Sequence, residues 1–311
     1  MTDRPNLDHA VVFGAPRSGT TFLMGVLDAL PEAECVTGNL FPIAIAHLAA
    51  QPLPAETLQT IERGFRGALG DYADDALYRS RSAALRKWWV ASRRLGALRS
   101  AARGARGERV LVYKEPFLSF SPQLAFDALP ASRLVYLVRD GRDVADSLLR
   151  KYDVLSNAKL GGLETNEAPI GRRYGEIHVP WWVEEGEEDA FAAADQFGRA
   201  IWMWSEMNAR CQDFLERPEV KRSGRVLAVR YEELMATPVE QGEALAEHLG
   251  MRLTGHARRR LEEAHVRSLG IHRKRDAASV RRAEEIAGEQ LGRLRYELAG
   301  ADRYPPRPVG R

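Results

Sequence analysis

Short apolar runs alternate with segments of helical periodicity along much of the chain. Residues 9–15 form a β-branched and aromatic run that contains Gly14, which is typical of a buried strand. From Gly19, apolar residues recur at helical spacing until Pro31, so a helix is expected to follow this strand directly. The same order of strand and helix recurs three times, with the strands at residues 109–114, 133–139 and 225–230.

An apolar segment that extends to Leu129 follows the first of these later strands. Helices are expected after the other two, at about residues 140–152 and about 238–248. A further helix is expected over residues 194–216, where large apolar residues recur on one face. Because strands that alternate with helices form parallel sheets covered on both faces, the sequence predicts an α/β fold with three layers, a central parallel sheet flanked by helices.

Two segments interrupt this order. Residues from about 50 to 107 are rich in Ala, Arg and Leu, include Trp88 and Trp89, and are predicted to be a helical insertion. Residues from about 153 to 190 resemble a long loop, which we expect to form a structured lid or substrate wall. Since no linker composition divides the chain, we expect one domain over residues 1–311.

Composition excludes several classes of protein. The 311 residues are 45% hydrophobic and 28% charged, with a formal net charge of +2, so no bulk basic field favours nucleic acid or an anionic membrane. No run approaches the roughly 18 apolar residues of a membrane-spanning helix. The chain begins without the pattern of a signal peptide and has only two cysteines, which predicts a cytoplasmic protein.

The most informative motif is Gly14-Ala-Pro-Arg-Ser-Gly-Thr-Thr21, between the first strand and its helix. Backbone N–H groups in such a loop, with the positive end of the helix dipole, form a cradle for an anion. The motif is similar to the P-loop of nucleotide-binding proteins, so the fold is expected to be P-loop-like. However, Thr20 replaces the phosphate-binding lysine, which argues against a kinase or ATPase, and Arg17 is the only full positive charge in the loop.

The run Pro16-Arg-Ser-Gly-Thr-Thr-Phe-Leu23 resembles the 5′-phosphosulfate loop of the sulfotransferases that use 3′-phosphoadenosine 5′-phosphosulfate (PAPS). Three further segments are similar to that family. Arg139-Asp-Gly-Arg-Asp-Val-Ala-Asp-Ser147 resembles its 3′-phosphate element, Val229-Arg-Tyr231 its strand with a Tyr near the adenine, and residues 268–275, more loosely, its Gly-plus-basic closing loop. The resemblance therefore implies that PAPS is bound by Arg17, Ser18, Gly19, Thr20, Thr21, Arg139, Ser147, Tyr231 and Arg273.

The position of Arg139 also has a physical reason. An apolar strand brings Arg139 to the carboxyl edge of the predicted parallel sheet, where ligands bind in such folds. Ser147 lies eight residues further on, about two turns along the following helix. A phosphate that contacts both residues would therefore lie beside that helix.

Sulfuryl transfer needs cations near the leaving oxygen, because charge develops there as the sulfonate moves in line. Arg17 is the first candidate. Lys114 is the second, because Tyr113-Lys-Glu-Pro-Phe117 is similar to a basic element of the family, especially that of tyrosylprotein sulfotransferases. Lys114 is also one of only six lysines in the chain.

A hydroxyl acceptor benefits from a general base, and here the sequence leaves alternatives open. The family's two base positions hold Pro116 and Gly38 in this chain. Glu115, next to the first of these positions, is the preferred candidate for the base. His47 and His178 remain alternatives.

The leading hypothesis is a PAPS-dependent sulfotransferase that acts on a hydroxyl of a small molecule, glycolipid or natural product. A P-loop-type small-molecule kinase is one alternative, and a non-catalytic module that binds adenosine bisphosphate is another. No metal is expected, because no His, Cys or carboxylate cluster has ligand spacing. The sequence leaves the identity of the acceptor and the oligomeric state open.

Overall fold

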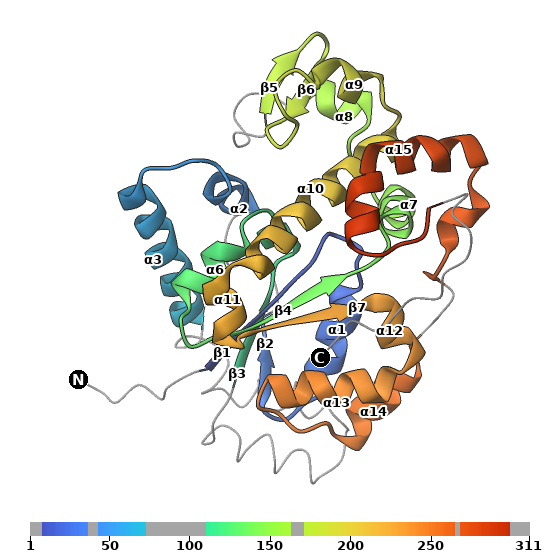
Figure 1. Ribbon diagram of the computed structural model, residues 1–311. Helices are drawn as coiled ribbons and strands as arrows, with labels where there is room; N and C mark the ends of the chain where they lie inside the picture. Colours follow the sequence, from blue (N-terminus) through green and yellow to red (C-terminus); the bar gives the residue numbers. More distant parts are fainter. Residues whose placement is uncertain (1–7, 37–42, 73–109, 163–170, 265–267, 299–311) are drawn as a thin grey trace. The chain divides into compact units, whose positions relative to one another are not determined.

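The computed structural model of the chain describes residues 8–36, 43–72, 110–162, 171–264 and 268–298 (Figure 1). Two compact units make up the chain. The first consists of residues Met1–Val138 and Arg210–Val266, and the second of residues Arg139–Ala209 and Arg267–Arg311. Each unit has a fold of its own, and the expectation of one domain over residues 1–311 stays a prediction.

The first unit contains a parallel sheet of five strands in the order β2-β3-β1-β4-β7. The strands are β1 (Asp8–Phe13), β2 (Ala33–Cys35), β3 (Val110–Lys114), β4 (Arg133–Val138) and β7 (Val226–Arg230). The predicted parallel sheet is confirmed, as are the four predicted strands. The short strand β2 was not predicted, because three residues that include Glu34 give no readable pattern.

Central strands of this sheet are buried on both faces. Residues 10–13 of β1 and 134–137 of β4 have no exposed surface. Complete burial explains why these strands appear in the sequence as continuous apolar runs instead of alternating apolar and polar residues. Their carboxyl ends meet at one edge of the sheet, since all the strands are parallel.

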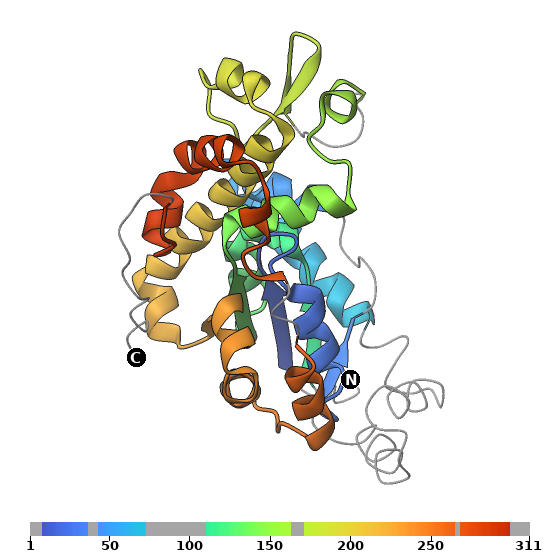
Figure 2. The same ribbon diagram turned by 90° about the vertical axis from the view of Figure 1, so that its right-hand side faces the viewer.

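Helices of the first unit flank the sheet. They are α1 (Thr20–Leu27), α2 (Ile43–Ala49), α3 (Ala55–Tyr72), the 3₁₀ helix η2 (Pro116–Phe120), α6 (Pro122–Ala128), α11 (Pro218–Ser223), α12 (Tyr231–Ala236), α13 (Pro238–His248) and α14 (Gly255–Glu262). Helix α14 packs against α1 and α13 (Figure 2), while α3 packs against α6 (Figure 1). The three-layer α/β prediction is therefore confirmed.

The first part of the segment predicted as a helical insertion contains helix α3. In α3 the residues Ile61, Phe65 and Leu69 are buried at a spacing of four, on one face of the helix. Trp88 and Trp89 lie outside the described residues.

The second unit is mainly helical. It contains α7 (Gly141–Lys151), α8 (Asn157–Gly161), the hairpin strands β5 (Gly171–Tyr174) and β6 (Ile177–Pro180), α9 (Glu188–Ala193), the 3₁₀ helix η4 (Ile271–Lys274) and α15 (Ala277–Arg293). Helix α10 (Gln196–Glu216) begins in this unit and ends in the first.

Residues 153–190 contain more regular structure than the predicted loop. They include α8, the β5–β6 hairpin and the start of α9, and Trp182 packs edge-on against Phe191 at 5.6 Å between ring centroids. The hairpin strands have only four residues each, and β5 carries Arg172 and Arg173, so no apolar alternation marked it in the sequence.

Candidate active site

The loop between β1 and α1 depends on two glycines in the left-handed region of φ. Gly14 has φ +153°, and a Cβ atom there would lie 2.1 Å from the carbonyl oxygen of Leu137 at the end of β4. Gly19, which caps the N-terminus of α1, has φ +102°, and its Cβ would lie 2.4 Å from the ring of Tyr231. Only residues without a side chain fit these positions, so the sequence of the loop fixes its path across the edge of the sheet.

Two residues between these glycines have features of a ligand site. Arg17 adopts φ +75°, one of three positive values at non-glycine residues in the described part of the chain, and such strain concentrates at functional sites. Ser18 is 1% exposed, and its hydroxyl has no hydrogen-bond partner among the described residues. Because a buried hydroxyl without a partner is costly, an anionic oxygen bound in the loop would stabilise it. The loop therefore fits a phosphosulfate group.

Lys114 lies next to this loop. In the register of the sheet, Lys114 on β3 pairs with Val12 on β1, and the backbone N–H of Glu115 donates to the Val12 carbonyl at 3.1 Å. Both strands end at this point, and the loop begins two residues after Val12. The structure therefore brings Lys114 and the glycine loop to the same edge of the sheet.

Glu115 is a buried carboxyl, 4% exposed, at the start of η2. Burial raises its pKa above the usual 4.5, although the N–H of Phe117, which donates to Oε1 at 2.9 Å, and the charge of Lys114 act in the opposite direction. A carboxylate with a raised pKa is a stronger base than an exposed one. Its position at the end of β3 also makes it a neighbour of Lys114.

His47, on α2, contacts the same short helix. Its ring centroid lies 5.3 Å from that of Phe117 and 5.0 Å from that of Phe120. Burial lowers the pKa of His47 to about 4, so its imidazole is neutral near pH 7. Two candidates for the base therefore lie at η2. Glu115 caps its N-terminus, and His47 of α2 packs against its phenylalanines.

His178, the third candidate for the base, belongs to β6 of the second unit. Its Nδ1 lies 3.2 Å from the carbonyl oxygen of Leu160. Because a carbonyl can only accept, Nδ1 must carry the proton of this hydrogen bond.

Tyr231 begins α12 directly after β7 and is 7% exposed. Its ring fills the space beside Gly19, so Tyr231 packs against the loop at this glycine. The motif gave no sign of this contact, because the two residues are far apart in the sequence. The predicted place of Tyr231 near an adenine stays a prediction.

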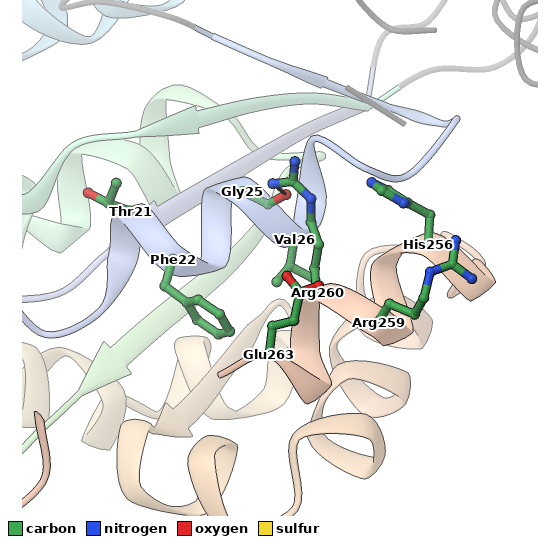
Figure 3. A pocket seen from close by; sticks show the side chains of 8 residues that line it. All are labelled: Thr21, Phe22, Gly25, Val26, His256, Arg259, Arg260 and Glu263. Atoms are coloured by element: carbon green, nitrogen blue, oxygen red, sulfur yellow. Dashed lines mark hydrogen bonds between the residues drawn. The ribbon is translucent and has the colours of Figure 1, made fainter. Parts of the chain in front are cut away.

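A pocket of about 580 Å³ opens between α1 and α14 (Figure 3). Thr21, in the first turn of α1, lies at one end, and His256 and Arg259 lie at the other. Between them, Arg260 donates a hydrogen bond to the carbonyl of Gly25 at 3.1 Å. The volume is within the usual range of ligand sites.

In the second unit, Arg139 is buried at the start of α7. It is 3% exposed, pairs with Asp143 at 3.6 Å and donates a hydrogen bond to the carbonyl of Ser268. The Nε1 of Trp204 donates to the carbonyl of Arg139 at 3.0 Å, which fixes the backbone there. Ser147 lies further along α7 and is partly exposed. Arg273 lies on η4, which packs against α7.

A sequence model described as the sulfotransferase family matches residues 10–176, more than half of the chain. The chain belongs to the sulfotransferase family. This sulfotransferase is therefore an enzyme that transfers sulfuryl groups, its family implies PAPS as the donor, and sulfotransferases act on hydroxyl acceptors. Family membership decides against the kinase and the non-catalytic module. The finer resemblance to tyrosylprotein sulfotransferases stays a prediction.

Several solved structures are similar to this sulfotransferase along nearly its whole length. The sulfotransferase domain of the Synechococcus PCC 7002 olefin synthase is 16% identical, with 96% of this chain and 98% of that chain covered and a TM-score of 0.49. A sulfotransferase from Alicyclobacillus acidocaldarius is 17% identical, with coverage of 95% and 97% and a TM-score of 0.46. STF9 from Mycobacterium avium is 17% identical, with coverage of 95% and 79% and a TM-score of 0.45. A comparison with curated protein sequences gave no significant match.

Two searches of the described residues gave negative results. No group of three or more His, Cys, Asp or Glu side chains among them could hold a metal ion. Among the helices of the same residues, none has the length and apolar character needed to cross a bilayer.

Proposed function

We propose that this sulfotransferase binds PAPS at the glycine loop and transfers its sulfuryl group to a hydroxyl of a small molecule, glycolipid or natural product. The buried hydroxyl of Ser18 supports this proposal most directly, because an anionic oxygen in the loop would satisfy it. PAPS supplies an activated sulfonate on a phosphate leaving group. Arg17, Ser18, Gly19, Thr20 and Thr21 would hold this end of the donor.

The proposed cations act on the charge that develops during transfer. Arg17 would neutralise charge on the sulfonate and bridging oxygens, since a guanidinium makes forked contacts with an oxyanion. Lys114, at the same edge of the sheet, would supply a second positive charge. Such groups act by electrostatic stabilisation, because they are already in place before the reaction.

In the second unit, Arg139, Ser147 and Arg273 would bind the 3′-phosphate. Burial of the Arg139 guanidinium at the start of α7 supports this role, because a phosphate there would meet a cation with little competition from water. Tyr231 would lie near the adenine. We also propose a cytoplasmic location, because a reducing compartment suits the two buried free cysteines, Cys35 and Cys211.

The proposed function is tested with labelled PAPS and a panel of alcohols and phenols. Calorimetry is expected to show binding of PAPS, and sulfated product is expected with at least one acceptor class. Absence of donor binding would refute the proposal. Binding of PAPS without sulfated product from any acceptor class would contradict the proposed transfer to these acceptors.

We propose Glu115 as the general base, and Glu115→Gln tests this role. The amide keeps an acceptor for the Phe117 N–H, so η2 retains its cap, but kcat is expected to fall about 100-fold. A base must be ionised, so wild-type kcat should decline as pH falls through the raised pKa of Glu115, above 4.5, and the variant should lack this decline.

The matched comparison is His47→Gln, which removes the alternative base that contacts the same short helix. If His47→Gln loses more activity than Glu115→Gln, the base is His47. If neither variant changes kcat by more than about threefold, His178→Gln becomes the next variant, since general bases contribute at least about 100-fold.

Arg139→Ala is expected to raise the KM for PAPS about 10- to 100-fold with little change in kcat, because a hydrogen bond to a charged group contributes about 1.5–3 kcal/mol. Steady-state kinetics at saturating acceptor measure both constants. Adenosine 5′-phosphosulfate, which lacks the 3′-phosphate, is the control donor. Its KM should change little in Arg139→Ala. An unchanged KM for PAPS would remove Arg139 from the donor site.

A further inference from the structure

A single carboxylate fastens residues 268–275 to the first turn of α7. Asp143 Oδ2 accepts the backbone N–H of Gly270 at 2.7 Å. Its Oδ1 accepts the backbone N–H of His272 at 3.2 Å and the ring Nδ1 of the same residue at 2.6 Å. A carboxylate only accepts, so Nδ1 carries a proton. Three donors from one segment therefore converge on one side chain.

The same carboxylate holds Arg139. The Nη2 of Arg139 lies 3.6 Å from Asp143 Oδ2 and also donates to the carbonyl of Ser268. The guanidinium of Arg139 is thus held by two elements. Asp143 on α7 is one contact, and the carbonyl of Ser268, in the segment 268–275, is the other. Arg139, Asp143 and His272 are 3%, 2% and 6% exposed, so this arrangement is nearly closed to water. Orientation by buried, charge-assisted contacts is tighter than orientation at the surface.

Asp143 remains negative in this environment. Burial acts to raise its pKa, but the hydrogen bonds from His272 and Gly270 outweigh it and hold the pKa below the usual value. All of these contacts engage the carboxylate with protein groups. It is therefore suited to hold other residues in place and unsuited to contact an anionic ligand directly.

We propose that Asp143 is a positioning residue for the 3′-phosphate of the donor. It fixes the guanidinium of Arg139 and places residues 268–275, with Arg273 among them, against the start of α7. This inference rests on the proposed function of Arg139 as a ligand of that phosphate. Asp143 would act through Arg139 and would not touch the donor.

Asp146, one turn further along α7, offers a matched control. It is 1% exposed, and its Oδ1 accepts the Nε of Arg275 at 2.6 Å. Arg275 in turn lies over the ring of Phe197 at 4.3 Å. Asp146 therefore holds the segment 268–275 at Arg275, whereas Asp143 holds it at Gly270, five residues earlier.

The test measures binding of adenosine 3′,5′-bisphosphate and adenosine 5′-monophosphate to the full chain by calorimetry. Wild type should bind the bisphosphate more tightly. Asp143→Asn is expected to weaken the bisphosphate at least about tenfold, the loss of roughly one charge-assisted hydrogen bond, and to leave the monophosphate within about twofold. Asp146→Asn should leave both ligands within about threefold, because Asp146 pairs with Arg150 and Arg275 and its substitution leaves the contacts between Asp143 and Arg139 in place.

The outcomes separate the inference from the function on which it rests. Equal affinity of wild type for the two ligands would refute the 3′-phosphate role of Arg139 itself. If wild type discriminates and Asp143→Asn discriminates equally well, Arg139 keeps its role and the positioning proposal is overturned. Equal weakening of both ligands by Asp143→Asn would make Asp143 a structural residue only and also overturns the proposal.

Asp143→Glu provides the decision if the asparagine variant does not fold. It keeps the charge but moves it by one methylene group, so the bisphosphate should weaken severalfold while the monophosphate is unchanged. Thermal unfolding of each variant shows that folded protein is compared. An unchanged affinity for the bisphosphate, or the same weakening for both ligands, would contradict the proposal.

Discussion

Arg17→Ala is expected to lower kcat by about 100- to 1000-fold, a loss of about 3–4 kcal/mol of transition-state stabilisation. The donor's Kd should change by less than about tenfold, because the loop backbone and the Ser18 hydroxyl remain. The reason for this difference is that charge on the leaving oxygens grows as the sulfonate departs. Single-turnover kinetics give the rate of transfer, and calorimetry with PAPS gives the Kd.

Two further substitutions at this position separate charge from backbone strain. Arg17→Lys keeps a positive charge and should recover part of the rate. Arg17→Gly removes the charge but suits φ +75°, so it should lose as much kcat as Arg17→Ala while unfolding at a higher temperature. Equal losses of kcat and affinity in Arg17→Ala would show that Arg17 only binds the donor.

The sheet could be predicted because its central strands are buried on both faces. Because residues 10–13 of β1 and 134–137 of β4 are completely buried, they appear in the sequence as apolar runs. The helices that follow them, α1 and α7, are recognised by apolar residues at helical spacing. The hairpin of β5 and β6 could not be predicted in the same way. Its strands are short, and the adjacent arginines Arg172 and Arg173 interrupt any apolar alternation. Arg172 instead makes contacts outside the hairpin, with Glu188 and the carbonyl of Val183.

The candidate site was predictable only where it is local in sequence. The glycine loop and Lys114 are short motifs at strand ends, and their residue types indicate anion binding without any tertiary information. The pair Asp143 and His272 is separated by 129 positions. Both residues lie in segments that resemble parts of the donor site, but no local pattern shows that these two side chains are hydrogen-bonded to each other. The contact of Tyr231 with Gly19 is hidden for the same reason.

That contact gives the second large effect, in Gly19→Ala. The substitution places a Cβ 2.4 Å from the Tyr231 ring and forces a non-glycine residue to φ +102°. Strain of about 1–3 kcal/mol and overpacking of about 1–3 kcal/mol should together lower the free energy of unfolding by about 2–6 kcal/mol. Since the loop must move to relieve the clash, PAPS affinity should fall at least about tenfold. Urea unfolding and calorimetry measure the two effects.

Gly224→Ala is the matched control, because Gly224 has φ +60° with nothing within 4 Å of the added Cβ. It should lose only about 1–2 kcal/mol of unfolding free energy, the penalty for left-handed backbone, and no donor affinity. A double-mutant cycle with Tyr231→Ala isolates the clash. In that background Gly19→Ala should cost about as much as Gly224→Ala does in the wild type. If Gly19→Ala costs the same with and without the Tyr231 ring, the ring does not determine the path of the loop.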